Sequence, residues 1–264
     1  MKKITILGGI LLAGASAGAM ASCADVTTAW TKSGATLASA VGVTGNGGYG
    51  LPMWVAIVDE TNKVCAIVNS GASGVTSGAT IGNKSWLGSR VIAIQKATTA
   101  NSFSLDAFSI STANLYGLTM PGGSLYGLQF SNPVDPAAAY AGSETTYGTG
   151  SDPAVGKRIG GINVFGGGLA LYNTAKVKVG AIGVSGDTSC TDHAVAWRLR
   201  ASMGLNNVPG GFISGYTGYT GPVIGDEMVI NTAGTVTNAY KQVSCAHNAI
   251  ANPTAGAATG VIVE

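Results

Sequence analysis

The chain has few charged residues: only 10% of its 264 positions are Asp, Glu, Lys or Arg, with 14 basic against 12 acidic side chains. Nucleic acids and anionic membrane surfaces attract proteins with a basic excess, so this composition argues against both as partners. A hydrophobic share of 46% excludes a disordered chain, which cannot bury enough apolar surface. With 41 glycines and little charge, the surface favours self-association over repulsion.

Motifs for metal or catalytic chemistry are also scarce. The two histidines and four cysteines form no CxxC or Cys/His cluster, which disfavours structural zinc. The segment GVSGD at 183–187 lacks the final glycine of a nucleophile elbow. The glycines at 166–168 precede an expected strand, whereas a phosphate-binding loop precedes a helix. No carboxylate pair has a glycosidase-like context. An enzyme is therefore the less favoured class, and one acting on a small organic acid has no positive support.

Long apolar runs are absent apart from one near the amino end. Lys2 and Lys3 precede the apolar stretch Ile4–Leu12, and Ala19-Met20-Ala21 has the pattern of a small-residue cleavage site. We therefore predict a signal peptide over residues 1–21, cleaved after Ala21. Removing it leaves 12 basic residues against 12 acidic ones and no transmembrane segment in the mature chain. The alternative is a lipoprotein acylated at Cys23, which the preceding Met20-Ala21-Ser22 matches poorly.

All four cysteines lie beyond the predicted cleavage site. An even number of cysteines in an exported chain predicts two disulfides, for which three connectivities are possible. The preferred hypothesis pairs Cys190 with Cys245, which would tie the C-terminal tail to the loop before the last helix. Cys23 would then pair with Cys65 and fasten the first helix to a strand.

Hydrophobic periodicity predicts helices alternating with hairpins, which is typical of an α+β fold with an antiparallel sheet. Residues 117–158 form a long irregular insertion, and residues 206–264, rich in Gly, Tyr and Thr, form an extension packed on the domain at 22–205. The expected elements are helices at 24–41, 85–103, 111–116 and 191–205, a strand at 162–165, and hairpins at 51–71 and 169–184.

Three segments together resemble the GlcG/HbpS family. Met53–Gly71 resembles its apolar strand, VVDxxGxxV turn and returning strand, with Asn62-Lys63 where the turn glycine is common. Ala93–Ser102, AIQKATTANS, is similar to the family helix with its Lys-Ala-x-Thr-Ala core. Gly166–Asp187 resembles the family's Gly-Gly-x-Pro hairpin and the following VGAIGVSG, with Ala170 in place of the proline.

The resemblance covers about residues 24–205 and implies a profilin-like α+β fold, with an antiparallel sheet of four to five strands flanked by helices. It also implies a homo-oligomer and, for some members, haem binding in haem sensing, storage or transport. Other relatives are linked to glycolate use or cobalamin metabolism. Because ligand usage varies within the family, the resemblance transfers no axial residue to this chain.

Candidate haem contacts follow from the residue types that hold haem iron, namely His, Met, Tyr and Cys. The cofactor-binding candidates are His193, Tyr126, Met120 and Lys96, and the metal-ligand candidates are His193 and His247. His193 is expected at the start of the last helix, where it ligates iron, donates to a propionate, or is satisfied by a nearby aspartate. Tyr126, with Phe130 and Tyr140, could line a pocket for a planar ligand, or could pack the insertion against the sheet. Lys96, Lys157 and Arg158 could meet carboxylates or stay solvated, and His247 could be simply exposed.

The sequence therefore predicts a secreted or periplasmic protein that binds haem or a related tetrapyrrole in uptake, storage or sensing. The signal peptide and the three family-like segments motivate this hypothesis. The alternative is an extracellular structural protein that self-assembles without catalytic activity, motivated by the neutral, glycine-rich surface and the tail.

Overall fold

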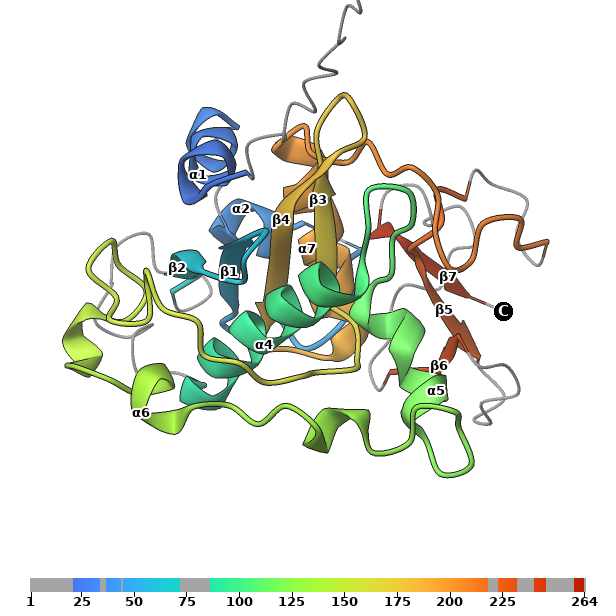
Figure 1. The fold of residues 1–264 in the computed structure, drawn as a ribbon, viewed down its shortest axis with the longest axis horizontal. Helices are drawn as coiled ribbons and strands as arrows, with labels where there is room; N and C mark the ends of the chain where they lie inside the picture. Colours follow the sequence, from blue (N-terminus) through green and yellow to red (C-terminus); the bar gives the residue numbers. More distant parts are fainter. Residues whose placement is uncertain are drawn as a thin grey trace, which may run out of the picture.

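The fold is built on one antiparallel sheet of four strands in the order β2-β1-β4-β3, with helices on both faces (Figure 1). The computed structural model describes residues 21–33, 37–43, 45–71, 86–217, 223–231, 240–245 and 259–263. The strands are β1 (Trp54–Asp59), β2 (Val64–Asn69), β3 (Gly168–Tyr172) and β4 (Lys178–Ser185). The predicted α+β class and its antiparallel sheet are confirmed.

The two predicted hairpins are both present and join through their inner strands. β1 pairs with β2 on one side and with β4 on the other, where Trp54 lies opposite Ser185 and Asp59 opposite Gly180. All six residues of β1 are buried, because helices cover both faces of this inner strand. Burial on both faces explains why these strands appear in the sequence as continuous apolar runs rather than alternating ones.

Helix α4 (Leu87–Phe103) packs on one face of the sheet, against the side chains of Trp54, Ala56 and Val58 (Figure 1). Its backbone rests directly on β4, because that strand has a glycine at the point of contact. A Cβ atom on Gly183 would lie 2.0 Å from the carbonyl oxygen of Ala93 and 2.5 Å from the amide nitrogen of Ala97. The missing side chain therefore sets the distance between helix and sheet.

Helices α7 (Ser189–Ser202), α1 (Cys23–Lys32) and α2 (Leu37–Val41) cover the opposite face. The helix predicted over 24–41 is thus two helices, and residues 34–36 between them lie outside the described part. Helix α7 begins two residues earlier than predicted. The hydroxyl of Thr188 accepts a hydrogen bond from the amide of Thr191 and so caps the helix at that point.

The predicted insertion at 117–158 contains only short elements, which are α5 (Tyr116–Thr119), η2 (Leu128–Phe130), α6 (Pro136–Ala139) and η3 (Glu144–Thr146). The predicted helix at 111–116 is present as η1 (Thr112–Leu115) followed by α5. Arg90 of α4 holds the insertion: its Nε donates to Asp152 at 2.9 Å and its NH1 donates to the carbonyl of Ala139 at 2.6 Å. The guanidinium also stacks on Tyr147, 3.9 Å from the ring centre.

The prediction of a strand at 162–165 is wrong. Residues 162–165 belong to no strand among the described residues, since the isolated bridge nearby joins Gly160 to Val134, and the amide of Asn163 donates to the hydroxyl of Thr99 at 3.0 Å. A short apolar run fits a strand or a buried loop equally well, and here the loop leads into the glycines before β3.

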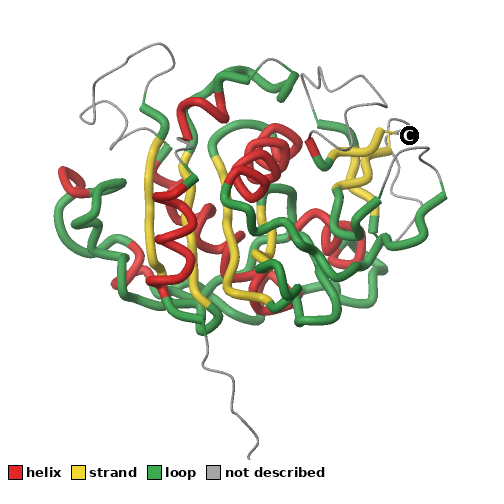
Figure 2. Tube along the Cα trace, turned by 90° about the horizontal axis from the view of Figure 1, so that it is seen from above, coloured by secondary structure: helices red, strands yellow, loops and turns green. Residues whose placement is uncertain are grey.

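The tail forms a second, parallel sheet of three short strands, β5 (Met228–Asn231), β6 (Lys241–Val243) and β7 (Val261–Val263), in the order β6-β5-β7. Figure 2 shows it as a separate group of strands beside the main sheet. Met228, Ile230 and Val261 pack with Cys190 and Ala194 of α7. The sequence pattern does not predict this sheet, because its strands are short and separated by long stretches.

Both predicted cysteine pairings are confirmed: Cys23 is bonded to Cys65 and Cys190 to Cys245. The first joins α1 to β2, and the second joins α7 to the segment after β6. Among the residues described, no helix is both long and apolar enough to cross a bilayer.

Candidate functional site

A buried ion pair links the helices on opposite faces of the sheet. Lys96 of α4 and Asp192 of α7 are both almost completely inaccessible, and the Lys96 Nζ lies 2.7 Å from Asp192 Oδ2. Nζ also donates to the carbonyl of Val184 at 3.0 Å and lies 4.7 Å from the centre of the Phe165 ring. Burial lowers the pKa of Lys96, which Asp192 partly offsets. Lys96 is therefore a structural cation, and no carboxylate of a ligand can reach it in this arrangement.

The glycine run before β3 makes room for this ion pair. A Cβ atom on Gly167 would lie 3.0 Å from both the Lys96 Nζ and the Asp192 Cβ, and 2.5 Å from the carbonyl oxygen of Val184. Gly167 also has a φ of +117°, which side-chain-bearing residues rarely adopt. Glycine is therefore needed at Gly167, because a side chain there would block the path of the Lys96 side chain from α4 to α7.

His193 lies next to this pair and is completely buried. Its ring stacks against that of Trp197, one turn later on α7, with 6.0 Å between ring centres. Neither ring nitrogen has a hydrogen-bond partner among the described residues, although the backbone of Gly260 approaches the ring. An imidazole buried without partners is unusual, because such a group loses its hydrogen bonds to water without replacement.

Residues of the tail cover His193. A Cβ atom on Gly166 would lie 3.2 Å from the His193 Cβ and 2.0 Å from the Met228 Cε, so β5 reaches the immediate surroundings of the histidine. Gly260, just before β7, is so close to Trp197 that its Cβ atom would lie 2.2 Å from the indole ring. Burial lowers the pKa of His193 to about 3, with Arg200 and Lys96 acting the same way and Asp226 acting against them. The imidazole is therefore neutral in the folded protein.

A second buried ion pair holds the tail in this position. Arg200 of α7 donates to both carboxylate oxygens of Asp226, at 2.5 and 2.9 Å, and the Ser109 hydroxyl donates to the same group at 2.7 Å. The guanidinium lies 4.5 Å from the centre of the Trp197 ring. Sequence reasoning missed this cluster, because Ser109, Arg200 and Asp226 lie in three separate segments. The one feature of the sequence that could have pointed to this cluster is the scarcity of charge. In a chain with so few charged residues, each aspartate and arginine is a candidate for a buried ion pair.

One small cavity, of about 290 Å³, opens beside the buried histidine. Ser189, which helps to line it, lies one helical turn before His193, and its carbonyl oxygen would be 2.5 Å from a Cβ atom on Gly166. The cavity is lined by Tyr116, Phe165, Thr188, Ser189 and residues 242–245. A larger cavity of about 580 Å³ lies elsewhere, between α1 and the two hairpin turns, and contains none of the predicted site residues.

The other predicted haem contacts are not brought together with His193. Tyr126 is 67% exposed in the insertion and Met120 is half-buried, and neither lines a described cavity. Phe130 and Tyr140 are also exposed, so in this chain they neither enclose a ligand nor bury the insertion. His247 lies outside the described residues.

Arg158 and Lys157 are exposed, and the Arg158 guanidinium donates to the carbonyl and hydroxyl oxygens of Thr61 in the β1–β2 turn. Arg158 therefore fastens the end of the insertion to the first hairpin. Neither cation lines either cavity described above.

The architecture places the chain among α+β proteins with helices on both faces of a four-stranded antiparallel sheet. Residues 28–199 match the family described as haem degrading protein HbpS-like, and since this is well over half of the chain, the protein belongs to the HbpS-like family. The family predicted from the three sequence segments is thereby confirmed.

Two solved structures are similar to the chain at low identity. Klebsiella pneumoniae protein ORFY is 20% identical with a TM-score of 0.40, and the alignment covers 69% of this chain and 89% of that one. The structure titled PduOC:Heme Complex is 20% identical with a TM-score of 0.42, covering 70% of this chain and 93% of that one. No curated protein matches the chain.

The described residues do not fit haem in this arrangement. His193 is the right type of ligand and has two unpaired nitrogens, yet it is completely buried and does not line the neighbouring cavity. Met228 and Gly260 of the tail occupy the space next to it. Iron could reach the histidine only after these tail residues had moved.

The His193→Leu variant is expected to resist acid better than the wild type. In the folded protein the ring stays neutral down to about pH 3 because it is buried, whereas the unfolded chain takes up this proton near its ordinary pKa of 6.5. The unfolded chain therefore binds more protons in this window. As the pH falls from 6.5 towards 3, His193 therefore lowers the unfolding free energy of the wild type by roughly 1.4 kcal/mol per pH unit. The variant has no imidazole at this position and loses nothing from this cause.

Urea denaturation of both proteins at a series of pH values measures this difference. Asp192 acts in the opposite direction, because burial raises its pKa to about 6, so its contribution to stability grows as the pH falls. Both proteins contain Asp192, and the difference between them isolates the imidazole. A difference that stays constant between neutral and acid pH would show that His193 is not buried as described.

Proposed function

We propose that this protein is an exported haem-binding protein that acts in haem uptake, storage or sensing, with His193 as its candidate iron ligand. The single observation that carries the proposal is the match to the haem degrading HbpS-like family over residues 28–199, a range that contains His193. The unpaired nitrogens of His193 beside a cavity with Tyr116 and Phe165 support the same site. Tyr116 and Phe165 line the cavity, and the neutral imidazole can bind a metal centre once the tail residues next to it have moved.

Export to the periplasm or the exterior is part of the proposal. The predicted cleavage site after Ala21 immediately precedes α1, and both cysteine pairs are oxidised, which suits a compartment that permits disulfides. The Cys23 sulfur is bonded to Cys65, and a sulfur in a disulfide has no free valence for the thioether of a lipid anchor. This bond favours release of the mature chain over the lipoprotein alternative.

Assembly into a homo-oligomer is also proposed. The exposed aromatic rings of Tyr126 and Phe130, 67% and 79% exposed, lie in one loop of the insertion, and exposed apolar groups of this kind favour association. The same observation supports the alternative of an extracellular self-assembling protein. The two functions are separated by whether haem binds, because assembly alone requires no ligand.

Titration of the purified mature chain with haemin tests the proposed function, followed by the Soret band and by size-exclusion chromatography of the same samples. We expect a saturable spectral shift, and at least about a tenfold loss of affinity in His193→Ala. Tyr126→Ala serves as the matched control, since Tyr126 lies away from the site, and it should bind as the wild type does. Absence of saturation would end the haem hypothesis.

A further inference from the structure

The two disulfides lie in opposite chemical surroundings. In one, the exposed-side sulfur, that of Cys245, faces hydrogen-bond donors, and in the other both sulfur atoms lie near oxygen acceptors. This difference matters because breaking a disulfide releases a thiolate, which donors and positive potential stabilise and negative oxygen atoms destabilise.

The Cys245 sulfur is surrounded by donors. The amide of Cys190 donates to it at 3.1 Å, and the hydroxyl of Ser189 lies 3.3 Å away and is the donor, because a disulfide sulfur has no hydrogen. The amide group of Gln242 lies 3.8 Å away, at the edge of hydrogen-bonding distance. Gln242 is oriented by Gly166, whose amide donates to its Oε1 at 3.2 Å, so that its NH2 group points to Ser189 and Cys245.

The accessibility of the two sulfur atoms also favours exchange at the Cys190–Cys245 disulfide. Cys245 is half-buried and lines the cavity of about 290 Å³, whereas Cys190 is completely buried. A thiolate entering through the cavity therefore meets the Cys245 sulfur first. The sulfur then released belongs to Cys190, the second residue of α7, where the helix dipole favours negative charge and the apolar side chains around the buried sulfur oppose it.

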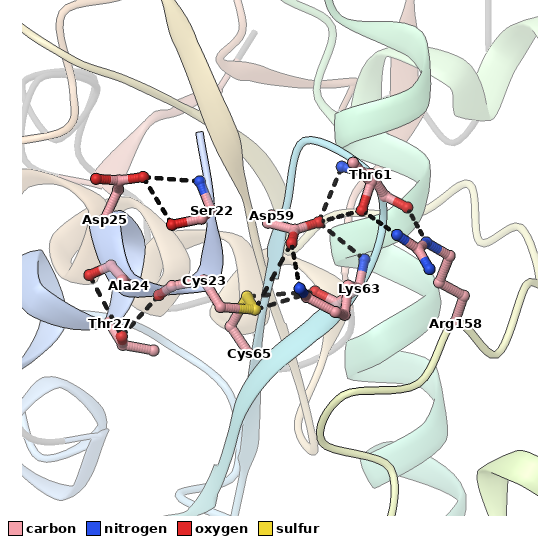
Figure 3. Close-up of a disulfide and its surroundings, with 10 residues drawn as sticks. All are labelled: Ser22, Cys23, Ala24, Asp25, Thr27, Asp59, Thr61, Lys63, Cys65 and Arg158. Carbon is pink, nitrogen blue, oxygen red and sulfur yellow. Dashed lines mark hydrogen bonds and ion pairs between the residues drawn. A yellow bond between two sulfur atoms is a disulfide. The ribbon is translucent and has the colours of Figure 1, made fainter. Parts of the chain in front are cut away.

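The Cys23–Cys65 disulfide also has a half-buried sulfur and a cysteine in the first turn of a helix, since Cys23 is the first residue of α1, but its sulfur atoms face oxygen acceptors instead of donors (Figure 3). A carboxylate oxygen of Asp59 lies 3.7 Å from the Cys23 sulfur, and the carbonyl oxygen of Lys63 lies 3.3 Å from the Cys65 sulfur. Burial raises the pKa of Asp59, yet the hydrogen bonds from Thr61 and Lys63 outweigh it and lower the pKa, so the carboxylate stays charged. Lys63 offsets part of this charge at 3.5 Å from Asp59. A thiolate formed here would face an anion.

We propose that the Cys190–Cys245 disulfide is a thiol–disulfide exchange site for a dithiol reductant, while Cys23–Cys65 is a permanent cross-link. One thiolate of the reductant attacks the Cys245 sulfur, forms a mixed disulfide and releases the Cys190 thiolate. The second thiol of the reductant then attacks its own sulfur in the mixed disulfide and releases the Cys245 thiolate. The protein gains two electrons and two protons, and the dithiol leaves as its disulfide.

The exchange site controls access to His193, an extension that rests on the proposed function. The disulfide holds residues 241–245 against the start of α7, where they line the cavity beside the histidine. Reduction removes the only covalent link described between the tail strands and α7. Gln242, whose Oε1 accepts from the amide of Gly166, can then leave with this segment and open the cavity toward His193, while the Arg200–Asp226 pair still holds β5.

Differential alkylation of the oxidised full chain tests the exchange site without haem. The protein is equilibrated with increasing dithiothreitol under native conditions, blocked with iodoacetamide, and analysed by peptide mass spectrometry. Cys190 and Cys245 should be half-labelled at roughly a tenfold lower dithiothreitol concentration than Cys23 and Cys65. Ser189→Ala, which removes one donor and leaves the Thr188 cap in place, should raise the dithiothreitol concentration at which Cys245 is half-labelled. Simultaneous opening of both disulfides, or earlier opening of Cys23–Cys65, would overturn the proposal.

Carbethoxylation of His193 by diethylpyrocarbonate, located by peptide mass spectrometry, tests the control of access. His193 should be protected in the oxidised protein and in the C23S/C65S control, and modified in the selectively reduced protein and in C190S/C245S. Circular dichroism confirms that each sample is folded. If a variant is not folded, the selectively reduced wild type alone tests whether the disulfide controls access to His193. Protection that persists after reduction would refute the control of access. Modification of His193 without any haem binding would instead refute only the proposed function.

Discussion

The K96M variant is expected to lose about 3–5 kcal/mol of unfolding free energy, the largest effect of any single charge removal considered for this protein. The substitution leaves the Asp192 carboxyl completely buried without the cation 2.7 Å away. It also removes the donor to the carbonyl of Val184 on β4. Methionine fills nearly the same volume, so the loss reports on the charge rather than on a cavity.

The double variant K96M/D192N should recover most of this loss, because no unpaired charge remains buried. Urea denaturation of the single and double variants gives the coupling between the two residues. K157M is the matched control: Lys157 is exposed, and its replacement should change stability by less than about 0.5 kcal/mol. A K96M protein as stable as K157M would mean that the pair does not form.

The Gly183→Ala variant should be destabilised by about 3 kcal/mol or more, although it adds only one methyl group. The new carbon would lie 2.0 Å from the carbonyl oxygen of Ala93 and 2.5 Å from the amide of Ala97. Both atoms belong to the backbone of α4, so the whole helix must move away from β4 and from its contacts with the sheet. Thermal and urea denaturation measure the loss.

Gly88→Ala is the control on the same helix. Gly88 lies in the first turn of α4 and is exposed, and a Cβ atom added to it would have no neighbour within 4 Å. Alanine there should leave stability unchanged or raise it by up to about 1 kcal/mol, because alanine is the better helix former. Equal effects of the two substitutions would show that Gly183 is not a point of close helix–sheet contact.

Much of the fold follows from local patterns. The apolar runs on either side of residues 59–63 predict the first hairpin, and the periodicity of Leu87, Val91 and Ile94 predicts α4, since both patterns depend on neighbours in the sequence. The even cysteine count predicts two disulfides, and the pairing preferred among the three possible ones is the pairing observed. The apolar run at 162–165 wrongly predicted a strand, because it lies in a loop. The strands of the tail were not predicted, because each has only three or four residues.

The candidate site could be predicted only in part. His193 was identified as a residue type that can bind iron, but its burial depends on tail residues such as Met228 and Gly260, which are distant in sequence. Lys96 was a candidate either to meet a ligand carboxylate or to stay solvated, and in the structure it pairs with Asp192, because the glycines before β3 leave a passage between the helices. No periodicity or spacing reveals a passage of that kind.

The sequence by itself determined the family, the α+β class, the hairpins and the main helices, because these depend on short-range patterns of apolar, glycine and cysteine residues. Only the tertiary structure decided which charges pair, what covers His193 and which sulfur atoms face donors or acceptors. Those properties depend on side chains from separate segments meeting at distances of a few ångströms in a low-dielectric interior, where a single neighbour changes the chemistry of a group.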